Sequence, residues 1–191
     1  MSVVFVDVDT QLDFLYPAGA LYVPGAERLL DKLARLNRHA VTKGIPLLST
    51  MDAHVEDDVE FRLWPPHCVA GTVGQQKPEC TLTAGRAVLA VAAREPVKAP
   101  QVLVEKVTTD CFTNPMLETL LDELRASEAV VYGVVTEICV ANAVRGLLRT
   151  GRRVTLVQDA VMSLDDAKAQ ALEAEVVASG GRLATASQVC G

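Results

Sequence analysis

The sequence predicts an α/β fold, a three-layer α/β/α arrangement around a mostly parallel, Rossmann-like sheet. Short apolar runs alternate with longer segments of helical periodicity, which is the order expected when a crossover helix follows each parallel strand. The runs are continuously apolar, as is typical of strands covered on both faces. A length of 191 residues suits one domain, so residues 1–191 are predicted to form a single domain.

The first elements show this alternation most clearly. Val3–Asp7 is a near-continuous apolar run and is expected to be a buried strand. From Ala26 to about Lys43, apolar residues recur every three or four positions, which predicts an amphipathic helix that ends at Gly44. The same reasoning gives, in chain order, strands Leu47–Met51 and Val102–Glu105, helix Pro115–Arg125, strand Ala129–Val134, helix Glu137–Thr150, strand Val154–Gln158, helix Asp165–Ala178 and a short last strand near Arg182–Ala186.

Two segments do not follow this alternation. Asp52–Pro78 is a long loop rich in Asp, Glu, Pro and Gly, and long ordered loops in compact domains usually serve a function. Cys80–Pro96 contains a helix-like Ala/Val segment to which the sequence assigns no role.

Composition excludes several classes of partner. The formal net charge is −6 and no basic cluster is present, which disfavours binding to nucleic acid or to an anionic membrane. No apolar run reaches the roughly 18 residues of a membrane span, and no signal peptide is recognisable. Five irregularly spaced cysteines do not form a disulfide framework. We therefore expect a cytoplasmic protein without membrane or nucleic-acid partners.

Three chemically useful side chains follow predicted strands, where open α/β sheets bind their ligands. Asp9 follows the first strand, and it is either a turn-capping acid or a general base at the edge of the sheet. Lys106 follows the third strand. It is either a surface lysine or a cation that lowers the pKa values of a carboxylate and a thiol in one pocket.

Cys139 is the third of these side chains. A strand ends near Val134 and a helix begins around Glu137 with Thr136 as a possible N-cap, so Cys139 is expected in the first helical turn, where a thiolate is favoured. The alternative is a small buried apolar cysteine. The remaining cysteines are interpreted as structural: Cys68, Cys80, Cys111 and Cys190.

The long loop carries a candidate metal site. Side chains two apart at the end of a strand point the same way, so Asp52 and His54 can share a divalent ion, and His67 can supply a third ligand. Glu60 is a further, less certain ligand, because the acidic run around it also suits a solvated face. Alternatively, His54 is hydrogen-bonded within a polar loop.

Other enzyme classes lack their signatures. If two of the three histidines hold a metal, none is left beside Cys139, which disfavours a papain-type Cys–His hydrolase. The sequence also lacks G-x-G-x-x-G, P-loop and G-x-S-x-G motifs, so nucleotide-binding and serine-esterase functions are not indicated.

Taken together, these motifs resemble the isochorismatase-like cysteine hydrolases, and within them most closely the metal-dependent nicotinamidases (pyrazinamidases). The resemblance covers about residues 3 to 160. It rests on a D-x-Q-x-D-F block from Asp9 to Phe14, on Lys106 after a later strand, and on the block GVVTEICV that ends at Val140. Asp52-x-His54 together with the block WPPHCVAGT from Trp64 to Thr72 is the most discriminating part.

The resemblance implies an isochorismatase-like hydrolase fold and a triad of Asp9, Lys106 and Cys139. Asp9 would take the thiol proton and pass it to the leaving ammonia, Lys106 would tune both groups, and Cys139 would form a thioester with the substrate. It also implies a cis peptide bond between Val134 and Val135, which turns the N–H groups of Val135 and Cys139 into an oxyanion hole.

The resemblance further implies one divalent metal ion, Zn²⁺, Fe²⁺ or Mn²⁺, held by Asp52, His54 and His67, with Glu60 less certain. The ion would hold the pyridine nitrogen of nicotinamide, and Phe14 and Trp64 would sandwich the ring.

The implied activity is hydrolysis of nicotinamide to nicotinate and ammonia, as in NAD salvage, by a homo-oligomer. The sequence departs from the nicotinamidase pattern at Ile138 and over Val107–Asn114, near the expected pocket. Another small carboxamide, carbamoyl compound or ureide is therefore the alternative substrate. A catalytically silent binding module is the alternative outside enzymes.

Overall fold

The computed structural model describes residues 2–191, which contain a seven-stranded sheet in the order β3-β4-β2-β1-β5-β6-β7. Every pair of neighbouring strands in this sheet is parallel, which confirms the predicted fold class. The strands are β1 (Ser2–Val8), β2 (Leu47–Asp52), β3 (Ala87–Leu89), β4 (Gln101–Lys106), β5 (Ala126–Val134), β6 (Arg153–Met162) and β7 (Arg182–Ala184).

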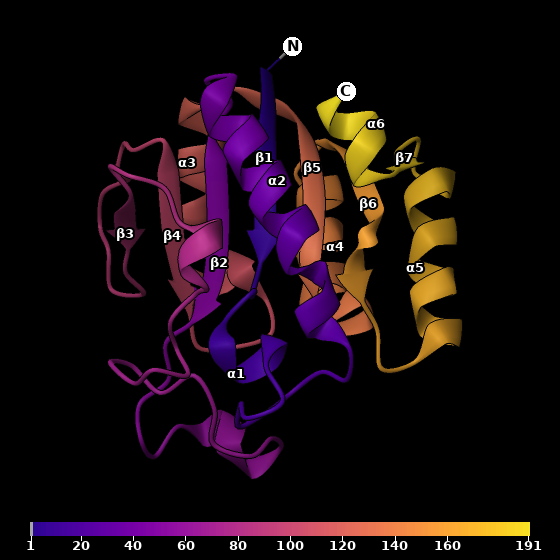
Figure 1. The fold of residues 1–191 in the computed structure, drawn as a ribbon. Coiled ribbons are helices and arrows are strands. Elements are labelled where there is room, and N and C mark those ends of the chain that lie inside the picture. Colours follow the sequence, from indigo (N-terminus) through magenta and orange to yellow (C-terminus); the bar gives the residue numbers. More distant parts are fainter. Residues whose placement is uncertain (1) are drawn as a thin grey trace.

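Helices cover both faces of the sheet (Figure 1). Alternating side chains of β1 divide between two cores: Val4, Val6 and Val8 pack against α3, α4 and α5, whereas Phe5 packs against α2 and α6. This is the pattern expected of a strand buried on both sides. The helices are α1 (Leu12–Leu15), α2 (Leu30–Thr42), α3 (Leu117–Glu123), α4 (Ala141–Arg149), α5 (Asp166–Ala178) and α6 (Ala186–Cys190).

Three local predictions differ from the structure. The segment Cys80–Pro96 is not helical in its Ala/Val part, because Ala87–Leu89 pairs with β4 as the edge strand of the sheet. The last strand stops at Ala184, since Thr185 caps α6 through a reciprocal bond with Gln188. The predicted helix from Glu137 begins as a π-helical turn, Thr136–Val140, and becomes α-helical only at Ala141.

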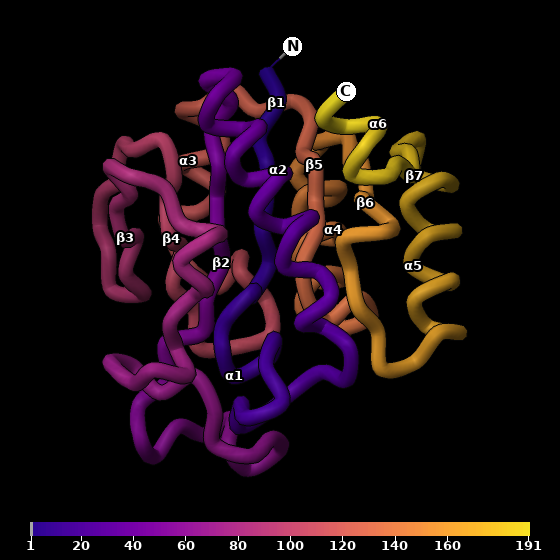
Figure 2. The backbone as a smooth tube through the Cα atoms, in the orientation of Figure 1, coloured from indigo at the N-terminus to yellow at the C-terminus, as the bar shows by residue number. Residues whose placement is uncertain are grey.

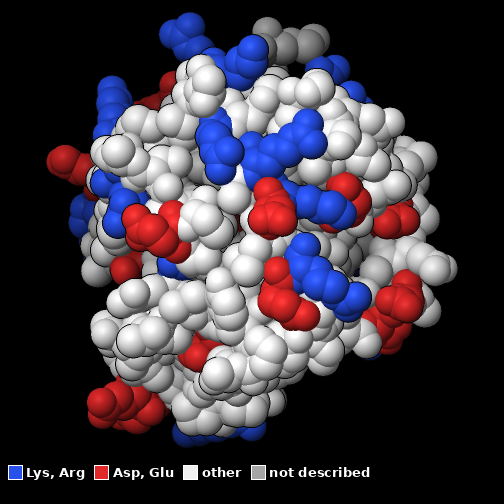
Figure 3. Space-filling model, viewed as in Figure 1, with Lys and Arg blue, Asp and Glu red and all other residues white. Residues whose placement is uncertain are grey.

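The carboxyl ends of the central strands gather at the end of the molecule opposite the two chain termini (Figure 2). The segment between β2 and β3, residues 53–86, folds over this end with little regular structure beyond 3-10 turns at Val59–Arg62 and Glu79–Thr81. The exposed apolar side chains of this segment include Val59, Leu63 and Val73. Basic and acidic side chains are interspersed over α2 (Figure 3). Within residues 2–191, no helix is long and apolar enough to cross a membrane.

Gly133 lets β5 pass close to β1. Its φ is +124°, and a Cβ atom there would lie 2.1 Å from the carbonyl oxygen of Val8. We expect Gly133→Ala to lower the free energy of unfolding by roughly 3 kcal/mol or more, because both strain and overlap oppose the side chain. Urea unfolding measures this change.

Gly151 is the matched control for this prediction. It also has a positive φ, +79°, but a Cβ atom there would meet nothing within 4 Å. Gly151→Ala is expected to cost only about 1 kcal/mol, the strain of the left-handed backbone alone. Equal losses in the two variants would show that crowding against Val8 contributes nothing.

Candidate active site

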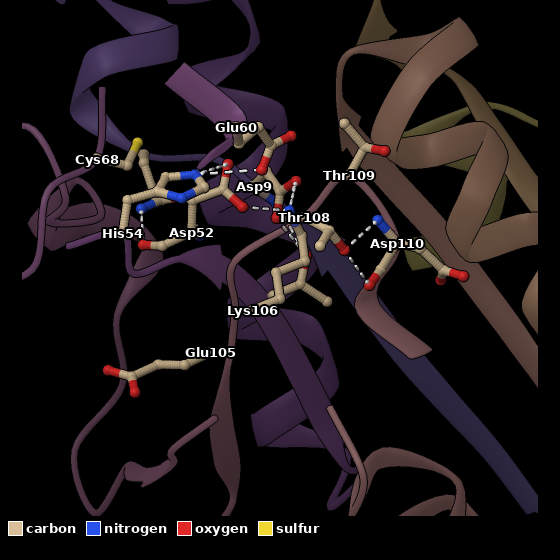
Figure 4. Close-up of polar contacts among 12 residues, drawn as sticks. Asp9, Asp52, His54, Glu60, Cys68, Glu105, Lys106, Thr108, Thr109 and Asp110 are labelled. Carbon is tan, nitrogen blue, oxygen red and sulfur yellow. Dashed lines mark hydrogen bonds and ion pairs between the residues drawn. The ribbon is translucent and has the colours of Figure 1, made fainter. Parts of the chain in front are cut away.

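Asp9 and Lys106 form a buried ion pair at the carboxyl edge of the sheet. Asp9 follows β1 and Lys106 ends β4, the two strands that flank β2, and Lys106 Nζ lies 2.8 Å from Asp9 Oδ2. The same ammonium donates a short hydrogen bond to Asp52 Oδ1 (Figure 4). Burial opposes its charge, but Asp52 and Asp9 raise the pKa of Lys106 well above its ordinary value. Lys106 is therefore a permanent cation shared by two carboxylates.

Thr50 fixes the orientation of the Asp9 carboxylate. Its hydroxyl donates a 2.6 Å hydrogen bond to Asp9 Oδ1, while the Asp9 N–H bonds the Thr50 carbonyl at 3.2 Å. Asp9 itself has φ +50°, a conformation that a non-glycine residue adopts only when its surroundings enforce it. Sequence reasoning missed Thr50, because a threonine inside a buried strand carries no signal of its partner.

Cys139 lies beside this pair as a neutral thiol. Burial raises the pKa of the thiol well above its usual value, although Lys106 pulls it down, and the Asp9 carboxyl adds to the rise. The expectation of a helix-stabilised thiolate is therefore wrong. The α-helix begins only after Cys139, and Thr136 makes no N-capping bond. A carboxylate near a neutral thiol can act as a base toward it.

The backbone just before the π-helical turn Thr136–Val140, which carries Cys139, is unusual. The peptide bond between Val134 and Val135 is cis, at the position that the resemblance implied. Val135 then accepts hydrogen bonds at its carbonyl from the N–H groups of Ile138 and Val140, both at 3.1 Å. These bonds hold the π-helical turn that carries Cys139.

Four donor atoms from the long loop and β2 converge next to Lys106. The Nε2 atoms of His54 and His67 lie 3.9 and 3.7 Å from Asp52 Oδ2, and Glu60 Oε2 lies 3.7 Å from His54 Nε2. Ligand atoms of Asp52, His54 and His67 all lie within 4.8 Å of one another. Two nitrogen and two carboxylate ligands suit a divalent transition metal.

Two of the donor atoms are buried without a polar partner among the described residues. Among residues 2–191, His54 Nε2 and Glu60 Oε2 are buried without a hydrogen-bond partner. Burial, followed by repulsion from Asp52, raises the pKa of Glu60. A bound divalent ion would satisfy both atoms and stabilise the ionised carboxylate, so these residues fit such an ion.

Further hydrogen bonds orient the candidate ligands. The second ring nitrogen of His54 lies 3.0 Å from Asp58 Oδ2, and that of His67 lies 2.7 Å from the Pro65 carbonyl. Such bonds fix the tautomer that leaves Nε2 free for a metal. Asp58 was grouped with the solvated acidic run in the sequence, where its partner could not be recognised.

Gln11 and Asp13 tie the ligand-bearing loop to the end of β1. The Gln11 amide donates to the carbonyls of Asp52 at 2.9 Å and Gln75 at 2.8 Å, and accepts from the Asp52 N–H at 2.7 Å. Asp13 accepts from the N–H of Cys68, next to His67, at 2.7 Å. The D-x-Q-x-D-F block thus supplies one candidate catalytic acid and two anchors.

Removing the Asp58 carboxylate tests whether its hydrogen bond orients His54 for a metal. We expect Asp58→Ala to weaken binding of Zn²⁺ or Mn²⁺ by about 10- to 100-fold, because His54 loses its orienting partner. Competition with a chromogenic chelator measures the affinity. The control is Asp57→Ala, which removes a neighbouring exposed acid and should change nothing. Equal affinities in the two variants would contradict the orienting role of Asp58.

One pocket of about 70 Å³ is lined both by Cys139 and by candidate metal ligands. Cys139, Asp52, Glu60 and His67 line it, together with mostly apolar side chains. The sequence-predicted residues Phe14, Trp64 and Val135 are among these, and Ile138 also lines it. Thr109, from the segment Val107–Asn114 that was expected near the pocket, lines it too, whereas sequence reasoning missed Leu21, Tyr22, Val23 and Leu164, which come from segments without a motif.

Comparison with known proteins decides the family. The model of the family described as isochorismatase domain matches residues 3–188. The chain belongs to the isochorismatase family. The resemblance inferred from its motifs is therefore confirmed at the family level.

Solved structures that resemble this chain include a pyrazinamidase and a complex with nicotinate. The pyrazinamidase of Pyrococcus horikoshii, in complex with zinc, is 25% identical with a TM-score of 0.80, and the match covers 97% of this chain and 99% of that chain. PnC1 from L. infantum, in complex with nicotinate, is 27% identical with a TM-score of 0.78, covering 97% and 93%.

A curated relative of this chain is a hydrolase with a different named substrate. Streptothricin hydrolase of Streptomyces noursei is 33% identical over 159 residues, which are 83% of this chain and 49% of that protein. The chain thus spans about half the length of that relative.

Proposed function

We propose that this isochorismatase-family amidohydrolase is a cysteine-dependent, metal-assisted nicotinamidase, which converts nicotinamide and water to nicotinate and ammonia. The observation that carries the proposal is the shared pocket: Cys139 and three candidate metal ligands line the same small cavity, with the Asp9–Lys106 pair buried beneath it. This arrangement supports the proposal, because a nucleophile, its base and an orienting site must lie close to one small substrate.

The protein groups suggest the following course of reaction. Asp9 accepts the Cys139 thiol proton as the sulfur bonds to the amide carbon, and the carbonyl oxygen becomes an oxyanion near the N–H groups of Val135 and Cys139. The C–N bond then breaks, and the Asp9 proton leaves with ammonia. Water, deprotonated by Asp9, attacks the thioester, which releases nicotinate and returns the thiol. Lys106 remains charged throughout.

The metal site would position the substrate. Asp52, His54, His67 and Glu60 would hold a divalent ion, which supplies a Lewis-acid contact for a ring nitrogen. Phe14 lies against His67, with ring centroids 5.4 Å apart, and lines the same pocket as Trp64. Apolar rings next to a nitrogen-binding ion suit a pyridine carboxamide.

The charges around the pocket favour a neutral substrate. Among the described residues that line it, none is a lysine or arginine, whereas Asp52 and Glu60 are acidic. The Lys106 ammonium is already shared by two carboxylates. A substrate carboxylate would therefore find no free cation among the lining side chains, which favours nicotinamide over a carbamoyl amino acid.

The alternative is another small neutral carboxamide or ureide. Ile138 and Thr109, which depart from the nicotinamidase pattern, both line the pocket, so they contact whatever ring or chain the substrate carries. Thr109 is the most informative of these, because Asn142 Nδ2 donates to its hydroxyl oxygen at 3.0 Å and leaves the hydroxyl proton free.

Ammonia release across a panel of amides tests the proposal. The panel comprises nicotinamide, pyrazinamide, benzamide, a ureide and N-carbamoylglycine, each with metal-loaded and chelator-stripped protein. We expect nicotinamide and pyrazinamide to exceed benzamide, which lacks a ring nitrogen, by about tenfold or more, and stripping to abolish this preference. A higher rate for the ureide would overturn the substrate assignment, and no turnover of any amide would indicate a silent module.

A further inference from the structure

One hydrogen bond joins the turn that carries Cys139 to the mouth of the pocket, and it has no role in the reaction described above. Glu137, two residues before Cys139, accepts a 2.9 Å hydrogen bond at Oε1 from the backbone N–H of Leu164. Leu164 lies in the short link between β6 and α5 and lines the pocket. Its side chain is 55% exposed, so it stands at the pocket mouth.

The remaining contacts of this link come from α5 rather than from the pocket. Ser163 Oγ donates to Asp166 Oδ1 at 2.9 Å, and Asp165 caps α5 by accepting from the N–H groups of Ala167 and Lys168. These bonds fix the link at its helical end only. The bond from Glu137 fixes Leu164 itself relative to Cys139.

The Glu137 carboxylate has no competing partner. Its Oε2 atom is buried without a hydrogen bond among residues 2–191, so the bond to Leu164 is the one that this side chain makes there. A glutamate in a turn next to a nucleophile, engaged only with the backbone of a pocket residue, holds that residue in place.

We propose that Leu164 limits the size of the substrate and that Glu137 is the positioning residue that holds it against the mouth. The use of nicotinamide derivatives as test substrates rests on the proposed function, whereas the effect of Leu164 on how easily a reagent reaches Cys139 does not. The pocket is small, about 70 Å³, and an isobutyl group fixed at its rim excludes ring substituents that a mobile or shortened side chain would admit.

A double-mutant cycle tests the link between the two residues. The variants are Leu164→Ala, Glu137→Ala, their combination, and Glu137→Gln, whose amide oxygen can still accept the bond. The substrates are nicotinamide and its bulkier 5-methyl and 5-phenyl derivatives. For Leu164→Ala we expect KM for nicotinamide to rise about tenfold with little change in kcat, and the relative kcat/KM of the 5-phenyl amide to rise about tenfold.

Glu137→Ala should shift selectivity in the same direction, and the double variant should differ little from Leu164→Ala, because one residue acts through the other. Glu137→Gln should behave like the wild type. Additive effects of the two alanine substitutions, or a loss of kcat in Glu137→Ala without a change in selectivity, would overturn the positioning role.

Alkylation of Cys139 separates this inference from the proposed function, because it needs no turnover. The background is Cys80→Ser/Cys190→Ser, which removes the exposed and the partly exposed thiols. The ratio of rates with N-phenylmaleimide and iodoacetamide should rise about tenfold in Leu164→Ala and in Glu137→Ala. A shifted ratio in a protein that hydrolyses no amide would refute only the proposed function. An unchanged ratio would refute the size limit, whatever the activity.

Discussion

Replacing Cys139 by alanine is expected to reduce amide hydrolysis by roughly 10⁴-fold or more while leaving substrate binding almost unchanged. The sulfur forms the bond to the amide carbon in the proposed reaction, and loss of a nucleophile removes the covalent route entirely. Trp64 is the one tryptophan of the chain and lines the pocket, so its fluorescence reports binding directly. We would measure ammonia release and the quenching of Trp64 by nicotinamide.

Cys111 provides a matched control for this substitution. It is also a buried thiol near Lys106 and Asp9, and burial raises its pKa to about 12. It does not line the active-site pocket, and Cys111→Ala should keep full activity with a loss of stability of about 1 kcal/mol. If Cys139→Ala retained more than a few per cent of the wild-type rate, the thioester route would be wrong.

Replacing Lys106 by methionine is expected to destabilise the fold by about 3–5 kcal/mol and to abolish activity. The substitution leaves Asp9 and Asp52 buried without their shared cation, and an uncompensated buried charge is far more costly than a missing contact. The substitution also removes the ammonium that contacts the Asp9 carboxyl, the base of the proposed reaction. Urea unfolding of metal-free protein and ammonia release below the unfolding transition measure the two effects.

Lys77 is a matched control for Lys106. Its ammonium is equally buried, 3.5 Å from Asp7 Oδ2 and 2.9 Å from Thr10 Oγ1, but it does not line the pocket. Lys77→Met should lose stability while its folded fraction remains active. In the Lys106→Met background, Asp9→Asn should recover part of the lost stability. A fully active Lys106→Met would exclude the proposed role of the ammonium.

The sheet and its main helices could be predicted because each depends on local pattern. The apolar run of β1 and the periodicity of α2 are read directly from neighbouring residues, and both elements form within a few residues of the expected bounds. Strand β3 was missed because three residues at a sheet edge leave no periodicity to recognise.

The residues of the candidate site were predictable where a reactive side chain directly follows a predicted strand. Asp9 and Lys106 were expected to meet and form a buried ion pair, and their charges are near enough to Cys139 to shift the pKa of its thiol. The ionisation of the thiol was not predictable, because it depends on burial by residues distant in sequence. The sequence also offered no sign of three hydrogen bonds: those of Thr50 with Asp9, of Asp58 with His54 and of Glu137 with Leu164. Each depends on a partner that the sequence pattern does not identify.

The anchoring of the long loop by Gln11 and Asp13 has a consequence for how such an enzyme could change its target. Gln11 and Asp13, which follow β1, hold the long loop through hydrogen bonds to two of its residues, Gln75 and Cys68. The part of the loop between these two residues contains no strand of the central sheet. A different segment that kept these two attachment points could therefore be exchanged into the same framework. Specificity could then be rewritten without rebuilding the machinery that breaks the bond.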